Sequence, residues 1–156
     1  SENNILKKLK NKNVKFCIGR IFSFTDNNQD KSFFIPAMFK KINDKKIKQF
    51  TFNGSDNLRD FIHIKEIVSS INLLYKNNST GIFNICSGKS YSLKKILFKI
   101  IKLCKSKKKI IFLKTSKRDN IIGNVNKLYN QIKKKPKSNL DEVLKKYWKG
   151  HYNKEL

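Results

Sequence analysis

Apolar and polar positions alternate along the chain with a spacing that predicts helices in some segments and strands in others. Between residues 93 and 104 the apolar residues recur every three or four positions, and lysines occupy the positions between them. This spacing is typical of a helix with one buried face. Ser92 stands directly before the stripe and is predicted to cap the helix, because a serine hydroxyl can accept a hydrogen bond from a first-turn amide. Similar spacing predicts a helix from residue 64 to residue 75.

Short apolar runs between polar loops predict the strands. The run at 14–22 is nearly continuous, which predicts a largely buried strand. Further strands are expected at 49–52, 61–64, 82–86 and 110–113, and further helices at 33–42, at 126–134 (stopped by Pro136) and at 140–149 (capped by Asn139 and ended by Gly150). Strands that alternate with helices indicate an α/β fold with a mainly parallel sheet, or part of one.

The large net charge of the chain is weaker evidence for function than its magnitude suggests. The chain has 156 residues and a formal net charge of +25, which favours an anionic partner such as a nucleic acid. However, 33 of the 36 basic residues are lysine, and Lys, Asn and Ile together fill 72 of the 156 positions. Codons rich in A and T encode all three, so a drift in genome composition would raise them together. We therefore interpret most lysines as a solvated surface, since basic proteins that bind nucleic acids usually use arginine for phosphate contacts.

The apolar content is typical of a folded domain with a sizeable core. Every apolar run is far shorter than the roughly 18–20 residues that span a bilayer, and the first ten residues lack the apolar centre of a signal peptide. We therefore expect a cytoplasmic protein with no membrane partner. Cys17, Cys86 and Cys104 are far apart and lack CxxC or histidine spacing, which indicates neither a disulfide framework nor a metal site.

Few side chains indicate chemistry. The glycines lie at least seven positions apart, so the chain has no glycine-rich loop of the kind that cradles phosphates. His63 and His151 are isolated, and His63, beside a strand, is expected to be structural. No serine has the context of a nucleophile elbow, and no carboxylates are paired for acid/base work. The sequence therefore predicts no catalytic residue.

Five segments occur in an order that is specific in combination. They are Arg20-Ile21-Phe22-Ser23, Phe34-Ile35-Pro36, Arg59-Asp60-Phe61-Ile62-His63-Ile64, Gly81-Ile82-Phe83-Asn84-Ile85 and Ser87-Gly88-Lys89-Ser90-Tyr91-Ser92-Leu93. Together they resemble the C-terminal half of an extended short-chain dehydrogenase/reductase, in the NAD(P)-dependent epimerase/dehydratase family that acts on nucleotide sugars. The tail is similar too, with Arg118-Asp119-Asn120 before a short helix and a proline.

The resemblance implies the C-terminal part of a Rossmann-type fold with its smaller α/β substrate lobe. Residues 1–24 would be the end of the NAD(P)-binding Rossmann domain. Residues 25–156 would be mainly the substrate-binding lobe, interleaved with elements of the Rossmann sheet. The glycine-rich loop that holds NAD or NADP and the catalytic Tyr-x-x-x-Lys would precede Ser1, so residues 1–12 would end the catalytic helix. The chain is then expected to be an inactive fragment of a homodimeric enzyme.

Two literal Tyr-x-x-x-Lys matches are rejected as the catalytic pair. They join Tyr91 to Lys95 and Tyr129 to Lys133. Neither lies on a helix that precedes the strand containing Arg20, as the family requires. In a chain so rich in lysine, such matches are expected by chance.

The family's substrate is a nucleotide-diphosphate sugar, and two arginines are candidates for its diphosphate. Arg59 and Arg118 are expected to bind there, since a planar guanidinium can hold two phosphate oxygens at once. The structural alternative pairs Arg59 with Asp60 or a nearby carboxylate, and Arg118 with Asp119. Arg20 lies within an apolar strand, so we expect an internal ion pair or carbonyl contacts for it.

The end of the first strand provides the remaining candidates. The resemblance places Ile21 and Phe22 beside the cofactor and Ser23 near the substrate, to which its hydroxyl could donate a hydrogen bond. The segment 25–27 (Thr-Asp-Asn) departs from the family pattern, which leaves open whether the enzyme is an epimerase, a dehydratase or a 4-keto reductase.

A small lysine-rich α/β protein that binds RNA is the alternative from another class. The lysine runs at 105–109 and 133–137 favour it. Neither run is interleaved with aromatic residues on which bases could stack. Nucleic acid is therefore not expected as a partner of the complete enzyme.

Overall fold

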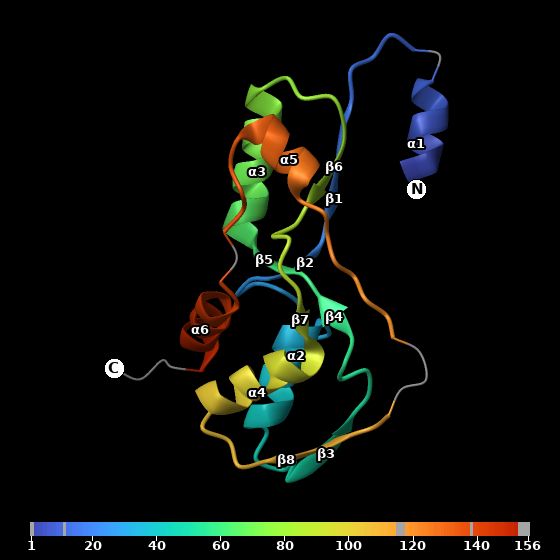
Figure 1. Cartoon of the computed structure of the whole chain (residues 1–156). Coiled ribbons are helices and arrows are strands. Elements are labelled where there is room, and N and C mark those ends of the chain that lie inside the picture. Colours follow the sequence, from blue (N-terminus) through green and yellow to red (C-terminus); the bar gives the residue numbers. More distant parts are fainter. Residues whose placement is uncertain (1, 11, 115–117, 138, 153–156) are drawn as a thin grey trace.

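Helices and strands alternate along the chain, as the apolar pattern predicts (Figure 1). The computed structural model describes residues 2–10, 12–114, 118–137 and 139–152. The helices of this part are α1 (Glu2–Leu9), α2 (Phe34–Asn43), α3 (Ile64–Lys76), α4 (Leu93–Leu103), α5 (Asn126–Ile132) and α6 (Leu140–His151). The strands are β1 (Cys17–Ile21), β2 (Ser23–Thr25), β3 (Gln49–Phe52), β4 (Leu58–Arg59), β5 (Phe61–His63), β6 (Gly81–Ile85), β7 (Tyr91–Ser92) and β8 (Lys109–Phe112).

The strands form pairs, most of them parallel. β1 pairs with β6, β2 with β5, and β3 with β8, all in parallel, whereas β4 pairs with β7 antiparallel. Parallel neighbours need a crossover connection, and the connection from β1 to β6 ends with α3, which contacts β1. The α/β class with parallel strands is thereby confirmed.

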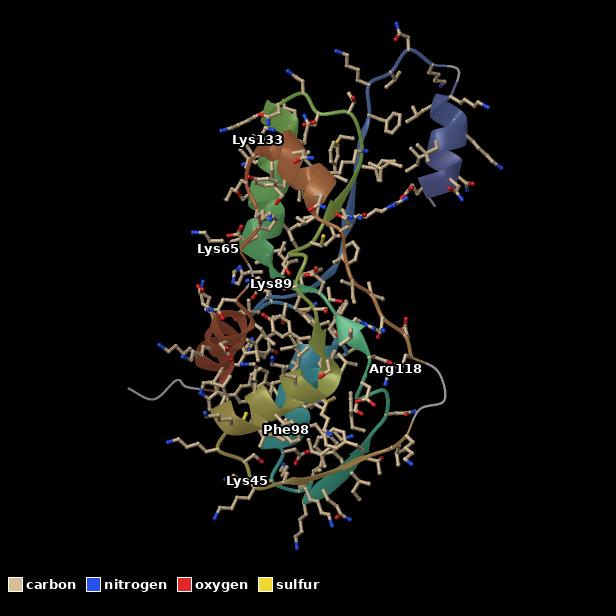
Figure 2. All side chains as sticks on the ribbon, in the orientation of Figure 1. Lys45, Lys65, Lys89, Phe98, Arg118 and Lys133 are labelled. Carbon is tan, nitrogen blue, oxygen red and sulfur yellow. The ribbon has the colours of Figure 1, made fainter. Side chains whose placement is uncertain are left out.

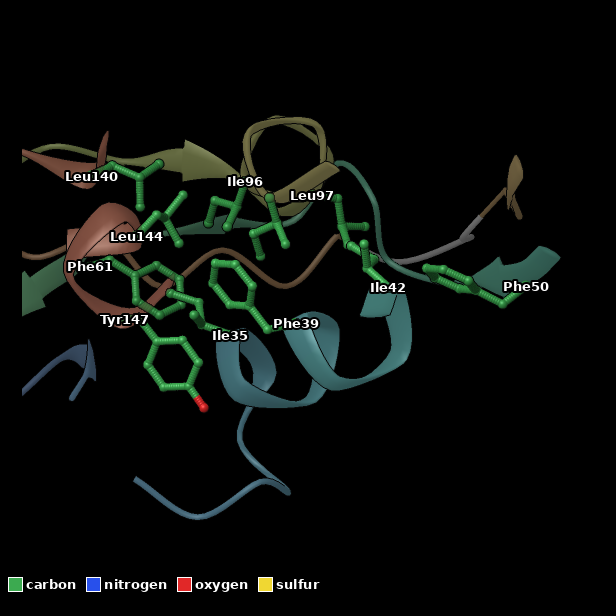
Figure 3. Close-up of a cluster of buried hydrophobic side chains, with 11 residues drawn as sticks. Ile35, Phe39, Ile42, Phe50, Phe61, Ile96, Leu97, Leu140, Leu144 and Tyr147 are labelled. Atoms are coloured by element: carbon green, nitrogen blue, oxygen red, sulfur yellow. The ribbon is translucent and has the colours of Figure 1, made fainter. Parts of the chain in front are cut away.

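Two packed regions follow one another along the molecule (Figure 1). One contains β1 and β6 with α3 and α5. The other contains α2, α4 and α6 with β3 and β8, and holds the larger core (Figure 3). In this core Phe39 is fully buried and its ring stacks on Tyr147 at 5.1 Å between centroids. Fully burying one such side chain stabilises the fold by about 1.5–3 kcal/mol. The chain returns from the second region to the first through α5, so segments from both ends of the sequence share the first region.

The local signals for helix starts are confirmed, whereas two helices end at other residues than predicted. Ser92 accepts a hydrogen bond from the amide of Lys95, and Asn139 accepts one from Asp141. Gly150 does not end the last helix, because α6 continues to His151. The helix before Pro136 ends earlier than expected, at Ile132. The next residue, Lys133, has φ +52° and reverses the backbone there.

The prediction that the first strand is largely buried is wrong. Most of β1 is exposed, including Ile21 at 50%. A strand of a parallel sheet is buried only when neighbours flank it and helices cover both faces. Among the described residues, β1 has β6 as its one strand neighbour. Arg20 is exposed for the same reason: it forms the expected ion pair, with Glu2 at 2.6 Å, but at the surface instead of the interior.

No helix in the described part of the chain is long and apolar enough to cross a membrane.

Candidate functional site

Arg59 lies on the two-residue strand β4, and its guanidinium is held from several directions. Nη2 donates to a carboxylate oxygen of Asp119 at 2.6 Å, and Nη1 donates to the carbonyl oxygens of Leu58 and Asp119. The side chain is only 16% exposed. The structural alternative of an ion pair with Asp60 or a nearby carboxylate is therefore confirmed in its second form: the carboxylate partner is not Asp60 but Asp119, which comes from a segment sixty residues away in the sequence.

The segment 118–121 lies along β4 and brings Arg118 next to Arg59. It forms a parallel bridge from Ile121 to Arg59. The accompanying hydrogen bonds are Asp119 N to Asn57 Oδ1 (3.0 Å), Leu58 N to Asn120 Oδ1 (2.9 Å), Ile121 N to Leu58 O (2.9 Å) and Asp60 N to Ile121 O (3.2 Å). Two backbone hydrogen bonds thus join the segment to β4, and the side-chain oxygens of Asn57 and Asn120 add two more, so that a short ladder forms. The two candidate arginines become neighbours although the sequence separates them widely.

The two arginines differ in their present contacts. Arg118 is exposed at the surface beside β4, and within the described ranges it has no hydrogen bond or ion pair (Figure 2). Its expected alternative partner, Asp119, is taken by Arg59. A guanidinium has five N–H donors in a fixed fork that suits phosphate oxygens. Arg118 can therefore bind an anion directly, whereas an anion at Arg59 would compete with the Asp119 carboxylate.

Asp60, the residue after Arg59, holds a different part of the fold. It is fully buried. One carboxylate oxygen accepts from the amide and the hydroxyl of Ser87, at 3.0 and 2.6 Å, and the other accepts from the amide of Gly88 at 2.8 Å. Gly88 has φ +73°, a conformation that favours glycine. Asp60 thereby ties the start of β5 to the turn after β6, joining two of the sequence segments that resemble the family.

The candidates at the end of β1 occupy a separate place. Ile21 ends the strand and is half exposed. Phe22 is half-buried, packs against the apolar cluster around Phe83, and donates its amide to Ile85 O at 3.1 Å. Ser23 starts β2 in register with Phe61, which follows Arg59 by two residues. β5 therefore connects this group to the arginines, and among the described residues no hydrogen bond or ion pair joins the two groups directly.

The buried cysteine near this strand end is not a nucleophile. Cys86 is fully buried, and burial together with the nearby Asp60 charge raises the pKa of its thiol to about 11. The thiolate is the reactive form of cysteine, so Cys86 is inert near neutral pH. Its sulfur packs against Gly123, where an added Cβ would come within 2.3 Å. Gly123 is therefore needed for close packing of the tail against β6.

In both Tyr-x-x-x-Lys matches, a lysine side chain covers the tyrosine ring. The Lys95 ammonium lies over the Tyr91 ring, 5.5 Å from its centroid, at the exposed start of α4. The Tyr129 ring on α5 is covered by Lys135, at 5.2 Å. Neither helix precedes β1. No group of metal-ligating side chains occurs within the described residues.

His63 has the structural role that the sequence predicts. It is the N-cap of α3, and its Nδ1 accepts a hydrogen bond from the amide of Lys65 at 3.0 Å. Burial, and next the charge of Lys146, lower the pKa of the imidazole. Both favour the neutral ring, which alone can accept at Nδ1.

This cap predicts a pH-dependent stability. Because the folded state binds a proton at His63 less readily than the unfolded chain, the cap contributes fully above the ordinary pKa of 6.5 and loses its contribution as pH falls below it. Asparagine caps helices well without titrating. We expect His63→Asn to lose less melting temperature than the wild type between pH 7.5 and pH 5.5. Parallel melting curves, with equal losses for both proteins, would contradict this role.

The sequence matches the family model of GDP-mannose 4,6 dehydratase over residues 3–147. None of the curated proteins matches the chain in sequence. The fold is that of solved enzymes. The dTDP-glucose 4,6-dehydratase of Bacillus anthracis, in complex with NAD, has a TM-score of 0.84 at 20% identity over 99% of this chain and 50% of its own.

Two further structures are similar to the same extent. RMD from Pseudomonas aeruginosa, complexed with NADPH, has a TM-score of 0.83 at 17% identity and covers 96% of this chain and 52% of its own. UDP-glucuronic acid 4-epimerase from Bacillus cereus, in complex with UDP-glucuronic acid and NAD, has a TM-score of 0.82 at 19% identity and covers 96% of this chain and 49% of its own. The chain thus spans about half the length of these enzymes. The family model covers nearly all of its residues, so the chain belongs to the GDP-mannose 4,6 dehydratase family, among the NAD-dependent epimerases and dehydratases of the extended short-chain dehydrogenase/reductase type.

Proposed function

We propose that the chain is the substrate-binding portion of an NAD(P)-dependent enzyme that modifies a nucleotide-diphosphate sugar, as an epimerase, a dehydratase or a 4-keto reductase. The observation that carries this proposal is the placement of Arg118 beside Arg59 by the ladder along β4. A diphosphate has two adjacent negative groups, and two arginines carried on adjacent segments can supply a guanidinium to each. We propose that the complete enzyme is a homodimer.

In this proposal each candidate has one role. Arg59 and Arg118 bind and orient the diphosphate, which fixes the sugar at the carboxyl end of β1, the edge where ligands bind in open α/β sheets. The hydroxyl of Ser23 donates a hydrogen bond to the sugar. Bound NAD or NADP would exchange a hydride with a sugar carbon.

The described residues fit only a small part of the cofactor. Ile21 and Phe22 offer apolar surface and backbone at the end of β1. A dinucleotide also needs a glycine-rich turn for its pyrophosphate, and the widely spaced glycines of this chain do not form one. The cofactor would therefore be held mainly by residues outside this chain.

This division of roles predicts what residues 1–156 bind by themselves. In calorimetric titrations we expect measurable binding of nucleoside diphosphates, which Arg118→Gln weakens, and little binding of NAD or NADP. No turnover of nucleotide sugars is expected. A melting curve recorded alongside verifies that the chain is folded, since the open edge of β1 favours aggregation. Micromolar affinity for NAD without affinity for nucleoside diphosphates would contradict the proposal.

A further inference from the structure

A strongly basic groove lies between the segment 133–137, the start of α3 and the start of α6. Its volume is about 900 Å³. Half of its fourteen lining residues are lysines, against 33 of 156 in the whole chain. They are Lys65, Lys89 and Lys146, and four of the five residues from 133 to 137. A uniform drift towards lysine would spread lysines evenly over the surface. It does not explain this concentration, in which lysines from segments far apart in the sequence meet in one groove. Figure 2 shows Lys65, Lys89 and Lys133 along the side away from Arg118.

The carboxylates in the groove neutralise only part of this charge. Glu66 lies 4.0 Å from the Lys134 ammonium, and Glu142 lies 2.8 Å from that of Lys146. Lys65, Lys89 and Lys137 are exposed, and their ammonium groups have no carboxylate partner among the described residues, although the backbone amide of Lys137 donates to Glu66 Oε2 at 3.2 Å. The groove therefore keeps several positive charges that no carboxylate in the described part of the chain neutralises.

The composition of the lining indicates which anion would suit it. Among the residues that the structure describes, the lining includes no arginine and no Phe, Tyr or Trp. Lysine supplies charge without the planar fork that selects one phosphate geometry, and stacking of a base requires an aromatic face. The groove would therefore recognise a ligand through repeated negative charges. The groove shares no residue with the site around Arg59, Arg118 and Ser23, so a ligand here would be independent of the diphosphate of the sugar substrate.

We propose that this groove binds a linear chain of phosphates, as found in inorganic polyphosphate. His63, on the groove wall, already responds to its positive field, since the charge of Lys146 adds to burial in lowering the pKa of that imidazole. Successive phosphates would each meet a lysine ammonium and release a counterion.

The test compares two triple variants with the same change in charge, in the protein at its full natural length. The groove variant carries Lys65→Gln, Lys89→Gln and Lys137→Gln. The control variant carries Lys102→Gln, Lys107→Gln and Lys109→Gln, three exposed lysines on and after α4 that lie outside the groove. Fluorescence anisotropy measures binding of labelled linear polyphosphate and of labelled oligo(U), over a series of salt concentrations. Melting curves verify that both variants remain folded.

We expect the groove variant to lose about a hundredfold in affinity at 0.1 M salt, because each phosphate contact contributes about fivefold there, and to lower the salt slope by about 2. The control variant should change little. The difference should appear with polyphosphate. A difference confined to oligo(U) would indicate a nucleic-acid ligand and contradict the proposal. Equal losses in both variants, or no binding of either probe to the wild type, would overturn the proposal.

Discussion

Replacing Asp60 by alanine is expected to lower the free energy of unfolding by about 2–4 kcal/mol. Its carboxylate accepts from both donors of Ser87 and from the amide of Gly88 in a buried place. Alanine leaves these donors without an acceptor, and an unpaired buried donor costs about 1–3 kcal/mol. Urea unfolding followed by circular dichroism measures the loss.

Asp56→Ala is the matched control for this prediction, because Asp56 is an exposed aspartate of the turn before β4. Its removal changes the net charge equally and should alter stability by less than about 0.5 kcal/mol. The loss of stability for Asp60→Asn should lie between the losses of the two alanine variants. The asparagine side chain keeps one acceptor oxygen, but its NH2 group replaces the other oxygen and faces a backbone or hydroxyl donor. If both alanine variants unfold at the same urea concentration, Asp60 does not hold the turn.

Arg59→Ala should raise the Michaelis constant for the nucleotide sugar about ten- to a hundredfold in the complete enzyme. The loss of a charge-assisted contact to phosphate costs about 1.5–3 kcal/mol, and each 1.4 kcal/mol is a factor of ten. Arg59→Lys should recover only part of this, because an ammonium lacks the two-pronged fork. Cofactor affinity should hardly change. Steady-state kinetics and cofactor titration on the same variants measure both quantities.

Two controls separate diphosphate binding from the structural role of Arg59. Arg20→Ala removes the same charge from an exposed arginine that pairs with Glu2, and should leave the Michaelis constant unchanged. Asp119→Ala removes the carboxylate that Arg59 now holds. If Arg59 serves only to hold the segment 118–121, Asp119→Ala will mimic Arg59→Ala. If Arg59 binds the diphosphate, Asp119→Ala will leave the Michaelis constant equal or lower, because a competing acceptor has gone.

The residues around helix starts show how much of the fold is local. Ser92 and Asn139 were predicted as caps and act as caps. A cap depends on a side chain and an amide two or three residues away, so neighbours in sequence suffice to determine it. The helix from 64 and the strand at 49–52 are likewise confirmed. The strand pair β4 and β7 was missed, because two residues carry too little periodicity to indicate a strand.

The sequence by itself determined the α/β class, the main helices and the family, since these depend on local spacing and on the order of short segments. Only the tertiary structure decided the partners of charged side chains. Arg59 pairs with Asp119 and Asp60 with Ser87, both at long range, although adjacent partners stood in the sequence. Likewise, the lysines at 65, 89 and 133–137 form one groove only after folding. Side chains that meet across the fold are separated by chain segments whose paths no local pattern encodes, so their contacts appear only when the elements pack.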